Sequence, residues 1–373
     1  MRGTASTVRI VAATIAGIGI AYIAVHYVHT GIIANRLFDS GLHSSLLATT
    51  SVSDADLPGA KPDSGDLIRY TGIVPHIFFH SLIIYPKEAS ADRVRSGLFK
   101  SNMITVDEFR AILSKMYAGH FVLIDSRLLY SIGPDGKMHK REPLIPKDKK
   151  PFVLSLDDLD YYETMKSDGF ADKLVLSSGK ILTEVVRPDG SVALTNDGDV
   201  VPIIDDFIAK HPDFSFGGAR GIIGVTGYDG ILGYRTQLPG TEGEIQKKAL
   251  LPVVAALKKE GWIFASHSYS HEHSFMQGTI STTSLSADIA KWRDEVGTLV
   301  GPTKVYIGPF GQIFSASDPR RTALLSAGFH VLYGVGLDQY VRYYDTYVQM
   351  DRIDVDGYRL AHNEKYLKKS LGI

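Results

Sequence analysis

An α/β fold, arranged as a distorted β/α barrel, is predicted for the sequence from residue 67 to residue 373. Two observations support this prediction. Short, apolar, β-prone runs alternate with amphipathic helical patterns, and acidic residues or histidines follow the ends of two of these runs. Such alternation is typical of parallel strands joined by crossover helices, in which side chains just past the carboxyl ends of the strands line the functional face. We expect fewer than eight strand–helix repeats.

The elements follow one another in a regular order. A strand is predicted over residues 74–80, and the next helix begins after Thr105, whose side chain can form a capping box with Glu108. The apolar run 152–156 follows Pro151 and is predicted to be a buried strand. Further helices and strands are predicted in alternation at residues 202–211, 221–226, 244–260, 262–265, 285–300 and 305–307.

An inserted β-hairpin is predicted within residues 172–200. Residues 180–186 and 191–194 are β-prone, and the Arg-Pro-Asp-Gly turn at 187–190 separates them. The hairpin stands after the strand that ends in acidic residues, so it either shapes a substrate groove or decorates the surface. The sequence does not distinguish these two interpretations.

The amino-terminal 33 residues have the pattern of a membrane anchor. Arg2 and Arg9 precede an apolar run over residues 10–28, which is long enough to cross a bilayer. Positive residues before the run predict a cytoplasmic tip and a single-pass protein whose remaining chain is extracytoplasmic. A signal peptide that is cleaved to release a secreted protein is the alternative. Residues 34–66 are rich in Ser, Thr, Asp, Pro and Gly, which predicts a linker.

Composition excludes several classes of function. The chain of 373 residues has a formal net charge of −1, so nothing favours nucleic acid as a partner. It contains no cysteine, which excludes disulfides, a thiol nucleophile and a thiolate metal site. The oligomeric state is not readable from the sequence.

Asp157 and Asp158 directly follow the predicted strand 152–156. That position is where polar side chains of an α/β fold usually perform chemistry. The alternative is that the two acidic residues merely begin a turn. On its own, the Asp157–Asp158 pair does not indicate a functional site; a second group of polar residues is needed to support that interpretation.

His267 and His271 supply that second group. They follow the predicted strand 262–265, and Ser266 is a suitable helix cap, so we expect the two imidazoles one helical turn apart on one face. Two histidines and a carboxylate suit Zn²⁺ and leave a coordination position for water. His76 and His80 have the same spacing, but on a strand they lie about 13 Å apart, too far for one ion.

The order of these motifs, followed by Pro309-Phe310-Gly311, resembles the polysaccharide deacetylase (NodB-homology) family over roughly residues 70 to 360. The resemblance implies a barrel of the deacetylase type. It implies that Asp157 is the catalytic base and that Asp158, His267 and His271 bind the divalent metal ion. It also implies that Phe310 lines the substrate groove and that its backbone N–H helps to hold an oxyanion.

The sequence departs from the family pattern at two places. Ile307 stands where the family commonly has an Arg that pairs with the catalytic Asp. The general acid is normally a His in a Leu-x-His setting, which here matches only His362, with His80 as a second candidate. Asp338 and Arg352 could replace missing charges, but their spacing assigns neither a role.

The resemblance implies a metal-dependent hydrolase that removes N-acetyl groups from an extracytoplasmic glycan, either peptidoglycan or a polymer of N-acetylhexosamine. An O-acetyl esterase could use the same water-activating site. A third interpretation is a degenerate relative that binds glycan or metal without turnover, which the missing Arg favours and the presence of Asp157 opposes.

Overall fold

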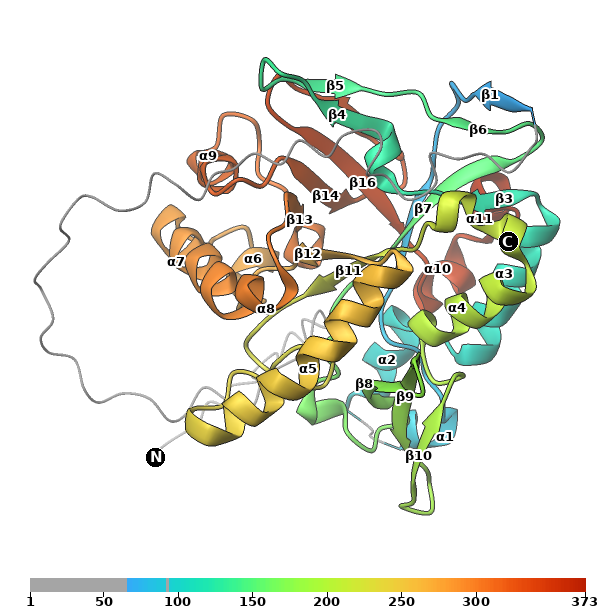
Figure 1. Ribbon diagram of the computed structural model, residues 1–373, viewed down its shortest axis with the longest axis vertical. Coiled ribbons are helices and arrows are strands. Elements are labelled where there is room, and N and C mark those ends of the chain that lie inside the picture. The colour runs from blue at the N-terminus through green and yellow to red at the C-terminus, as the bar shows by residue number, and fades with distance from the viewer. Residues whose placement is uncertain (1–65, 92–93) are drawn as a thin grey trace, which may run out of the picture. The chain divides into compact units, whose positions relative to one another are not determined.

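The computed structural model describes residues 66–91 and 94–373. Seven parallel strands close into a barrel in the order β11-β12-β13-β14-β16-β2-β7, and β7 pairs again with β11 through Ser155 and Leu156. This confirms the predicted barrel with fewer than eight strands (Figure 1). Its strands are β2 (His76–Phe79), β7 (Lys150–Leu156), β11 (Ile222–Val225), β12 (Ile263–Ser266), β13 (Val305–Ile307), β14 (Val331–Val335) and β16 (Val348–Asp354).

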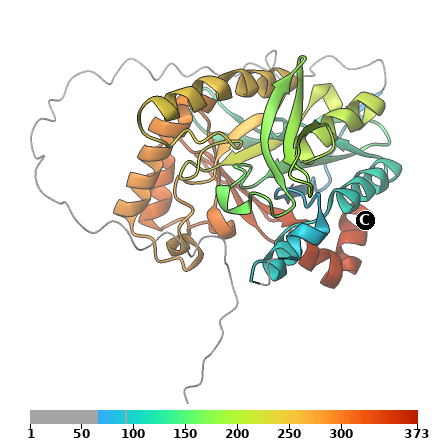
Figure 2. The ribbon, with the colours of Figure 1, turned by 90° about the horizontal axis from the view of Figure 1, so that it is seen from below.

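Helices surround the barrel. Orange α7 and teal α3 lie on opposite sides of the strands (Figure 2). The principal helices are α3 (Val106–Ala118), α4 (Val200–Lys210), α5 (Gly240–Glu260), α7 (Thr282–Trp292), α9 (Pro319–Ser326) and α11 (Glu364–Leu371). The shorter ones are α1 (Pro86–Ala89), α2 (Ser96–Asn102), α6 (His273–Met276), α8 (Thr298–Val300) and α10 (Gly357–His362).

The strands of the barrel are apolar on both faces because both faces are covered. One cluster fills the barrel interior and includes Ile222, Val305, Val331 and Met350. A second, larger cluster lies between the strands and the helices. Strands buried on both sides lack the alternation of a half-exposed sheet, which is why the strand at 152–156 is a continuous apolar run.

The remaining strands flank the barrel. A hairpin of β4 (Tyr130–Ile132) and β5 (Met138–Lys140) contributes Met138 to the cluster that fills the barrel interior. Strands β3 (Phe121–Leu123) and β15 (Val341–Tyr343) pair with β7 and β16, and β1 (Leu67–Arg69) pairs with β6 (Leu144–Pro146).

The start of α3 agrees with the prediction in detail. Thr105 Oγ1 accepts a hydrogen bond from the Glu108 backbone N–H at 3.2 Å, and the Thr105 N–H donates to Glu108 Oε2 at 2.8 Å. The predicted capping box is therefore confirmed. It satisfies two of the donors that a helix leaves free at its amino end.

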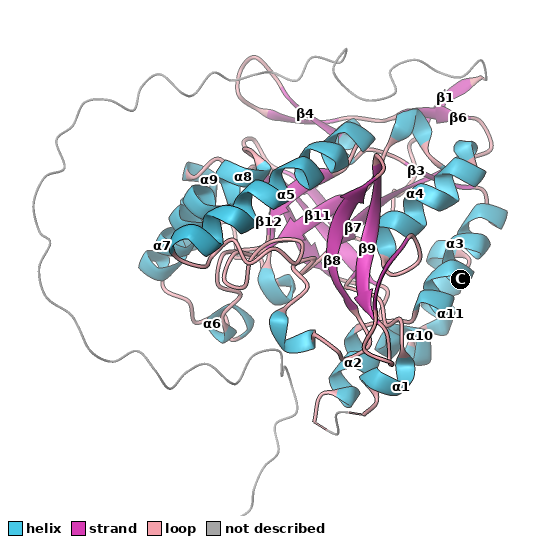
Figure 3. Cartoon of the chain, turned by 60° about the horizontal axis from the view of Figure 1, so that its bottom comes forward, coloured by secondary structure: helices cyan, strands magenta, loops and turns pink. Residues whose placement is uncertain are grey.

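The insertion is a three-stranded antiparallel sheet. Strands β9 (Lys180–Val186) and β10 (Val192–Thr195) confirm the predicted hairpin, and β8 (Ala171–Ser177) adds a strand that the sequence analysis did not predict. Strands β8 and β9 pack against α5, and β9 also packs against α4 (Figure 3).

The predicted membrane segment, and the predicted linker as far as residue 65, lie outside the described residues. Within residues 66–91 and 94–373, no helix combines the length and the apolar character needed to cross a membrane.

Asp199 joins the insertion to the barrel. As the N-cap of α4, its Oδ1 accepts hydrogen bonds from the backbone N–H of Val200 at 2.7 Å and of Leu82, in the loop after β2, at 3.1 Å. Its carboxyl is fully buried, and burial raises its pKa to about 6.

This raised pKa predicts a pH-dependent stability. Between about pH 4 and pH 6 the folded protein keeps a proton that the unfolded chain has lost, so this group's contribution to the free energy of unfolding falls by about 3 kcal/mol as pH rises. Asp199→Asn keeps the acceptor oxygen without the charge. The free energy of unfolding of this variant, relative to that of the natural protein, should therefore rise by about 3 kcal/mol between pH 4 and pH 7. It is measured by urea denaturation in the presence of a chelator. A constant difference across this range would contradict the prediction.

Candidate metal centre

The predicted acidic pair and His267 meet at the carboxyl end of the barrel. Asp157 and Asp158 follow β7, and His267 follows β12. Both strands pair in parallel with β11, which lies between them. Parallel strands present their carboxyl ends at the same rim, so residues more than 100 positions apart in sequence come together there.

Asp158, His267 and His271 form a group whose potential ligand atoms all lie within 4.8 Å of one another. His267 Nε2 lies 3.8 Å from Asp158 Oδ1, and His271 Nε2 lies 3.8 Å from Asp158 Oδ2. In a triangle with sides of 3.8 to 4.8 Å, the centre lies about 2.2–2.8 Å from each corner, compared with about 2.0–2.2 Å for zinc bonds to nitrogen and carboxylate oxygen. The donors therefore fit a divalent ion such as Zn²⁺ with a small contraction.

His267 is oriented by the neighbouring strand. Its ring is 2% exposed, and Nδ1 lies 3.0 Å from the backbone oxygen of Ile307 at the end of β13. Because that carbonyl can only accept, the neutral ring carries its proton on Nδ1, and its Nε2 lone pair faces Asp158. A backbone partner of this kind is the usual support of a histidine that binds a metal ion.

The helix predicted after Ser266 does not form, and this prediction was wrong. Ser268 and His271 have φ angles of 61° and 47°, and the chain turns through a loop before α6 begins at His273. The N–H groups of Tyr269 and Ser270 donate to the Asp288 carboxylate of α7 at 2.7 and 2.9 Å instead of joining a helix. The two imidazoles therefore approach through a tight loop.

A hydrogen bond within this loop holds the backbone at His271 in place. The His271 N–H donates to Ser268 Oγ at 2.9 Å. Burial lowers the pKa of His271 to about 4, although the Asp158 carboxylate acts in the opposite direction. The imidazole is therefore neutral at pH 7, which is the form that binds a metal ion.

Asp157 has a cationic partner that the sequence analysis did not assign. The Arg352 guanidinium donates from Nη1 to Asp157 Oδ1 at 2.6 Å and from Nη2 to Oδ2 at 2.8 Å. Both side chains are almost fully buried. The cation absent at Ile307 is thus supplied from β16, which corrects the expectation that Asp157 lacks such a partner. Asp338, the other residue considered for this role, is exposed.

Arg352 is itself held on several sides inside the barrel. Its Nη1 donates to Ser155 Oγ at 3.1 Å, its Nε donates to the Gly334 backbone oxygen at 3.2 Å, and its guanidinium carbon lies 4.1 Å from the centre of the Phe78 ring. His76 Nε2 lies 3.0 Å from the same Ser155 oxygen. A buried polar column of His76, Ser155, Arg352 and Asp157 therefore leads from β2 to the rim.

The column determines the charge of Asp157. Burial alone would raise the pKa of this carboxyl, but the Arg352 guanidinium, together with His267 and His80, outweighs burial and holds the pKa well below its usual range. Asp157 is therefore ionised at neutral pH. The two hydrogen bonds from Arg352 also fix the orientation of its carboxylate group.

The two candidate acids differ in their surroundings. His80 directly follows β2 at the same rim, close enough to Asp157 and Asp158 to lower the pKa of both carboxyls electrostatically when it is protonated. Its Nδ1 is buried without a hydrogen-bond partner among the described residues. His362 is exposed at the end of α10, where its hydrogen bond and ring contact are both with Tyr358. The geometry favours His80, and the role of either residue stays a prediction.

Phe310 stands at the edge of the ligand group. It lies in a short turn at Pro309–Gly311 with a φ angle of 55°, and its side chain is 41% exposed. Its ring centre lies 4.4 Å from that of His271 and 6.2 Å from that of His273, on which it stacks. An exposed ring in contact with a potential metal ligand is consistent with the predicted place of Phe310 in a groove.

The insertion contributes a wall to a pocket of about 280 Å³. Its lining includes Asp172, Lys173 and Glu184 from the inserted sheet, together with Glu163 and Arg235 from the two loops near the ligand group. None of the three potential metal ligands lines this pocket, so both interpretations of the insertion stay predictions.

The comparisons with known proteins give distant likenesses. No family model and no curated protein matches the chain. The deacetylase PplD of Streptococcus pyogenes in complex with acetate is 13% identical, with a TM-score of 0.40 over 79% of this chain and 98% of that one. A de-N-acetylase from Aggregatibacter actinomycetemcomitans is 12% identical, with a TM-score of 0.44 over 79% of this chain and 99% of that one. Likenesses this distant assign no activity to the chain.

Proposed function

We propose that the protein is a metal-dependent hydrolase that removes N-acetyl groups from a glycan. The observation that carries the proposal is the juxtaposition of three potential metal ligands with a buried, ionised carboxylate at the rim of the barrel. A binding site alone has no use for the second carboxylate. The bidentate support of Asp157 by Arg352 also removes the main reason to regard the site as degenerate.

Each residue has a role in this proposal. Asp158, His267 and His271 would hold a divalent ion, which when bound polarises an acyl carbonyl and lowers the pKa of a water molecule. Asp157 accepts the proton of the attacking water, and the Phe310 N–H stabilises the oxyanion. His80 donates a proton to the departing sugar amine. An amine is a poor leaving group without that proton, so this step distinguishes amide from ester hydrolysis.

We further propose that the reaction takes place outside the cytoplasm, on peptidoglycan or a polymer of N-acetylhexosamine. This location rests on the apolar run at residues 10–28 and the basic residues before it.

Metal dependence tests the proposed activity directly. The full-length protein should release acetate from N-acetylglucosamine oligomers when loaded with one equivalent of Zn²⁺. Release should stop after chelation and return when Zn²⁺ is added back. Acetate is measured by a coupled assay, with the chelated protein as the matched control. Full zinc occupancy without acetate from any acetylated glycan would refute the activity.

A further inference from the structure

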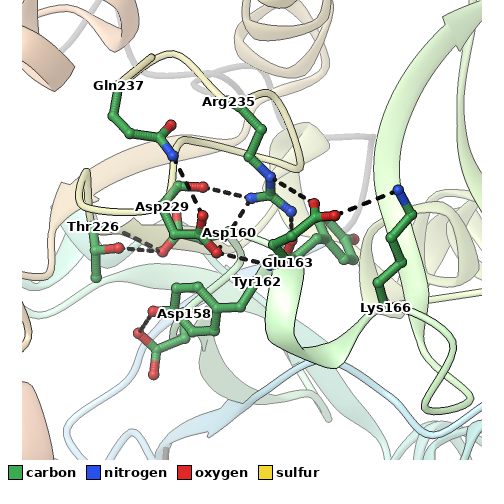
Figure 4. A network of polar contacts seen from close by, with 10 residues as sticks. Asp158, Asp160, Tyr162, Glu163, Lys166, Thr226, Asp229, Arg235 and Gln237 are labelled. Atoms are coloured by element: carbon green, nitrogen blue, oxygen red, sulfur yellow. Dashed lines mark hydrogen bonds and ion pairs between the residues drawn. The ribbon is translucent and has the colours of Figure 1, made fainter. Parts of the chain in front are cut away.

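Tyr162 contacts the candidate metal ligand Asp158 directly. Its hydroxyl donates a hydrogen bond to Asp158 Oδ1 at 2.6 Å (Figure 4). Hydrogen bonds to an ionised carboxylate are shorter and stronger than those between neutral groups. The contact therefore restricts how the carboxylate can turn.

The chain needs an unusual backbone to bring Tyr162 back onto a residue four positions earlier. Asp158 and Tyr161 have φ angles of 54° and 50°, in the left-handed region that residues other than glycine seldom adopt. Each such residue costs free energy and persists only where the surroundings enforce it.

The loop between β11 and α5 provides this enforcement. Asp160 Oδ2 accepts hydrogen bonds from Thr226 N and Oγ1 at 3.0 and 2.9 Å. The Glu163 N–H donates to Asp229 Oδ2 at 2.7 Å, and Arg235 donates to the Tyr161 backbone oxygen (Figure 4). Residues on both sides of Tyr162 are thus held by one loop, and the tyrosine between them is directed at Asp158.

A second tyrosine packs against the first but makes no such contact. The rings of Tyr162 and Tyr228 are stacked, with centres 5.1 Å apart and an angle of 26° between their planes. The Tyr228 hydroxyl is buried and makes no hydrogen bond with Asp158. The two side chains share one environment and differ in whether the hydroxyl reaches the carboxylate.

From this arrangement we propose that Tyr162 is a positioning residue that sets the orientation of Asp158 toward a divalent cation. The inference rests on the metal site of the proposed function. Outer partners that orient a ligand commonly contribute a factor of about 10 to 100 to metal affinity. In this chain the partner is a hydroxyl on the same loop as the ligand, held there by the loop at Thr226–Arg235.

The stacked pair provides a matched test. In the full-length protein, Tyr162→Phe should weaken Zn²⁺ binding by about 10- to 100-fold, since it removes the hydroxyl and keeps the stacked ring. Tyr228→Phe removes a buried hydroxyl that does not contact Asp158 and should change the affinity by less than about 3-fold. Affinities are measured by competition with a chromophoric chelator, and thermal unfolding of the metal-free variants shows whether both remain folded.

The outcomes separate this inference from the proposed function. Unchanged zinc affinity in Tyr162→Phe, or equal losses in both variants, would show that the hydroxyl does not position the ligand. If the predicted difference is found but no glycan yields acetate, the inference stands and the proposed activity fails. A natural protein that binds no zinc would overturn both.

Discussion

Replacement of Arg352 by Met should lower the free energy of unfolding by about 3–5 kcal/mol, measured by urea denaturation of the metal-free protein. Met fills a similar space but leaves the Asp157 carboxylate, which is 3% exposed, without its cation. A buried charge that loses its partner keeps its full desolvation cost. Chelator removes metal binding from the comparison, because a bound ion would stabilise the folded state independently.

Two further variants make this test specific. Combining Arg352→Met with Asp157→Asn removes both charges, so the double variant should be more stable than Arg352→Met alone. Arg110→Met breaks an exposed ion pair with Asp197, whose side chain is 50% exposed, and should cost less than about 1 kcal/mol. Equal effects of Arg352→Met and Arg110→Met would mean that the buried pair contributes no more than a surface one.

Replacement of His267 by Ala should weaken Zn²⁺ binding by more than about 100-fold, the upper range for the loss of an outer partner, because it removes a ligand itself. The same holds for His271→Ala. Acetate release at equimolar zinc should fall in parallel with occupancy. Binding is measured by competition with a chelator of known affinity.

His273 provides the control. It lies two positions beyond His271, is exposed, and stacks on Phe310, but it is not part of the ligand group. His273→Ala should therefore leave zinc affinity within about 3-fold of the natural protein. Retained affinity in His267→Ala, or an equal loss in His273→Ala, would show that the ligand assignment is wrong.

The parts of the site that local sequence predicts are those at strand ends. Asp157, Asp158 and His267 each follow a short apolar run, and a parallel barrel brings such positions to one rim whatever their separation in sequence. The capping box at Thr105 is equally local. The placement of these residues could be predicted because the relevant interactions lie within a few residues or follow from the regular architecture.

The parts that were missed depend on contacts between distant segments. The turn at His271 forms because Asp288, on a later helix, takes the N–H groups that a local helix needs. Arg352 meets Asp157 only because β16 and β7 flank β2 in the closed barrel. Tyr162 lies close to Asp158 in sequence, but its direction depends on two left-handed residues that a distant loop supports.

The origin of Arg352 in the last strand of the barrel has a consequence for synthesis of the chain. The three potential metal ligands have all left the ribosome before β16 is made, since His271 precedes it by more than 75 positions. The buried carboxylate at Asp157 therefore has no counterion in the nascent chain, and desolvating it early is unfavourable. Closure of the barrel by β16 and the pairing of Asp157 with Arg352 are thus one event, so the buried carboxylate acquires its counterion only when the last strand of the barrel is in place.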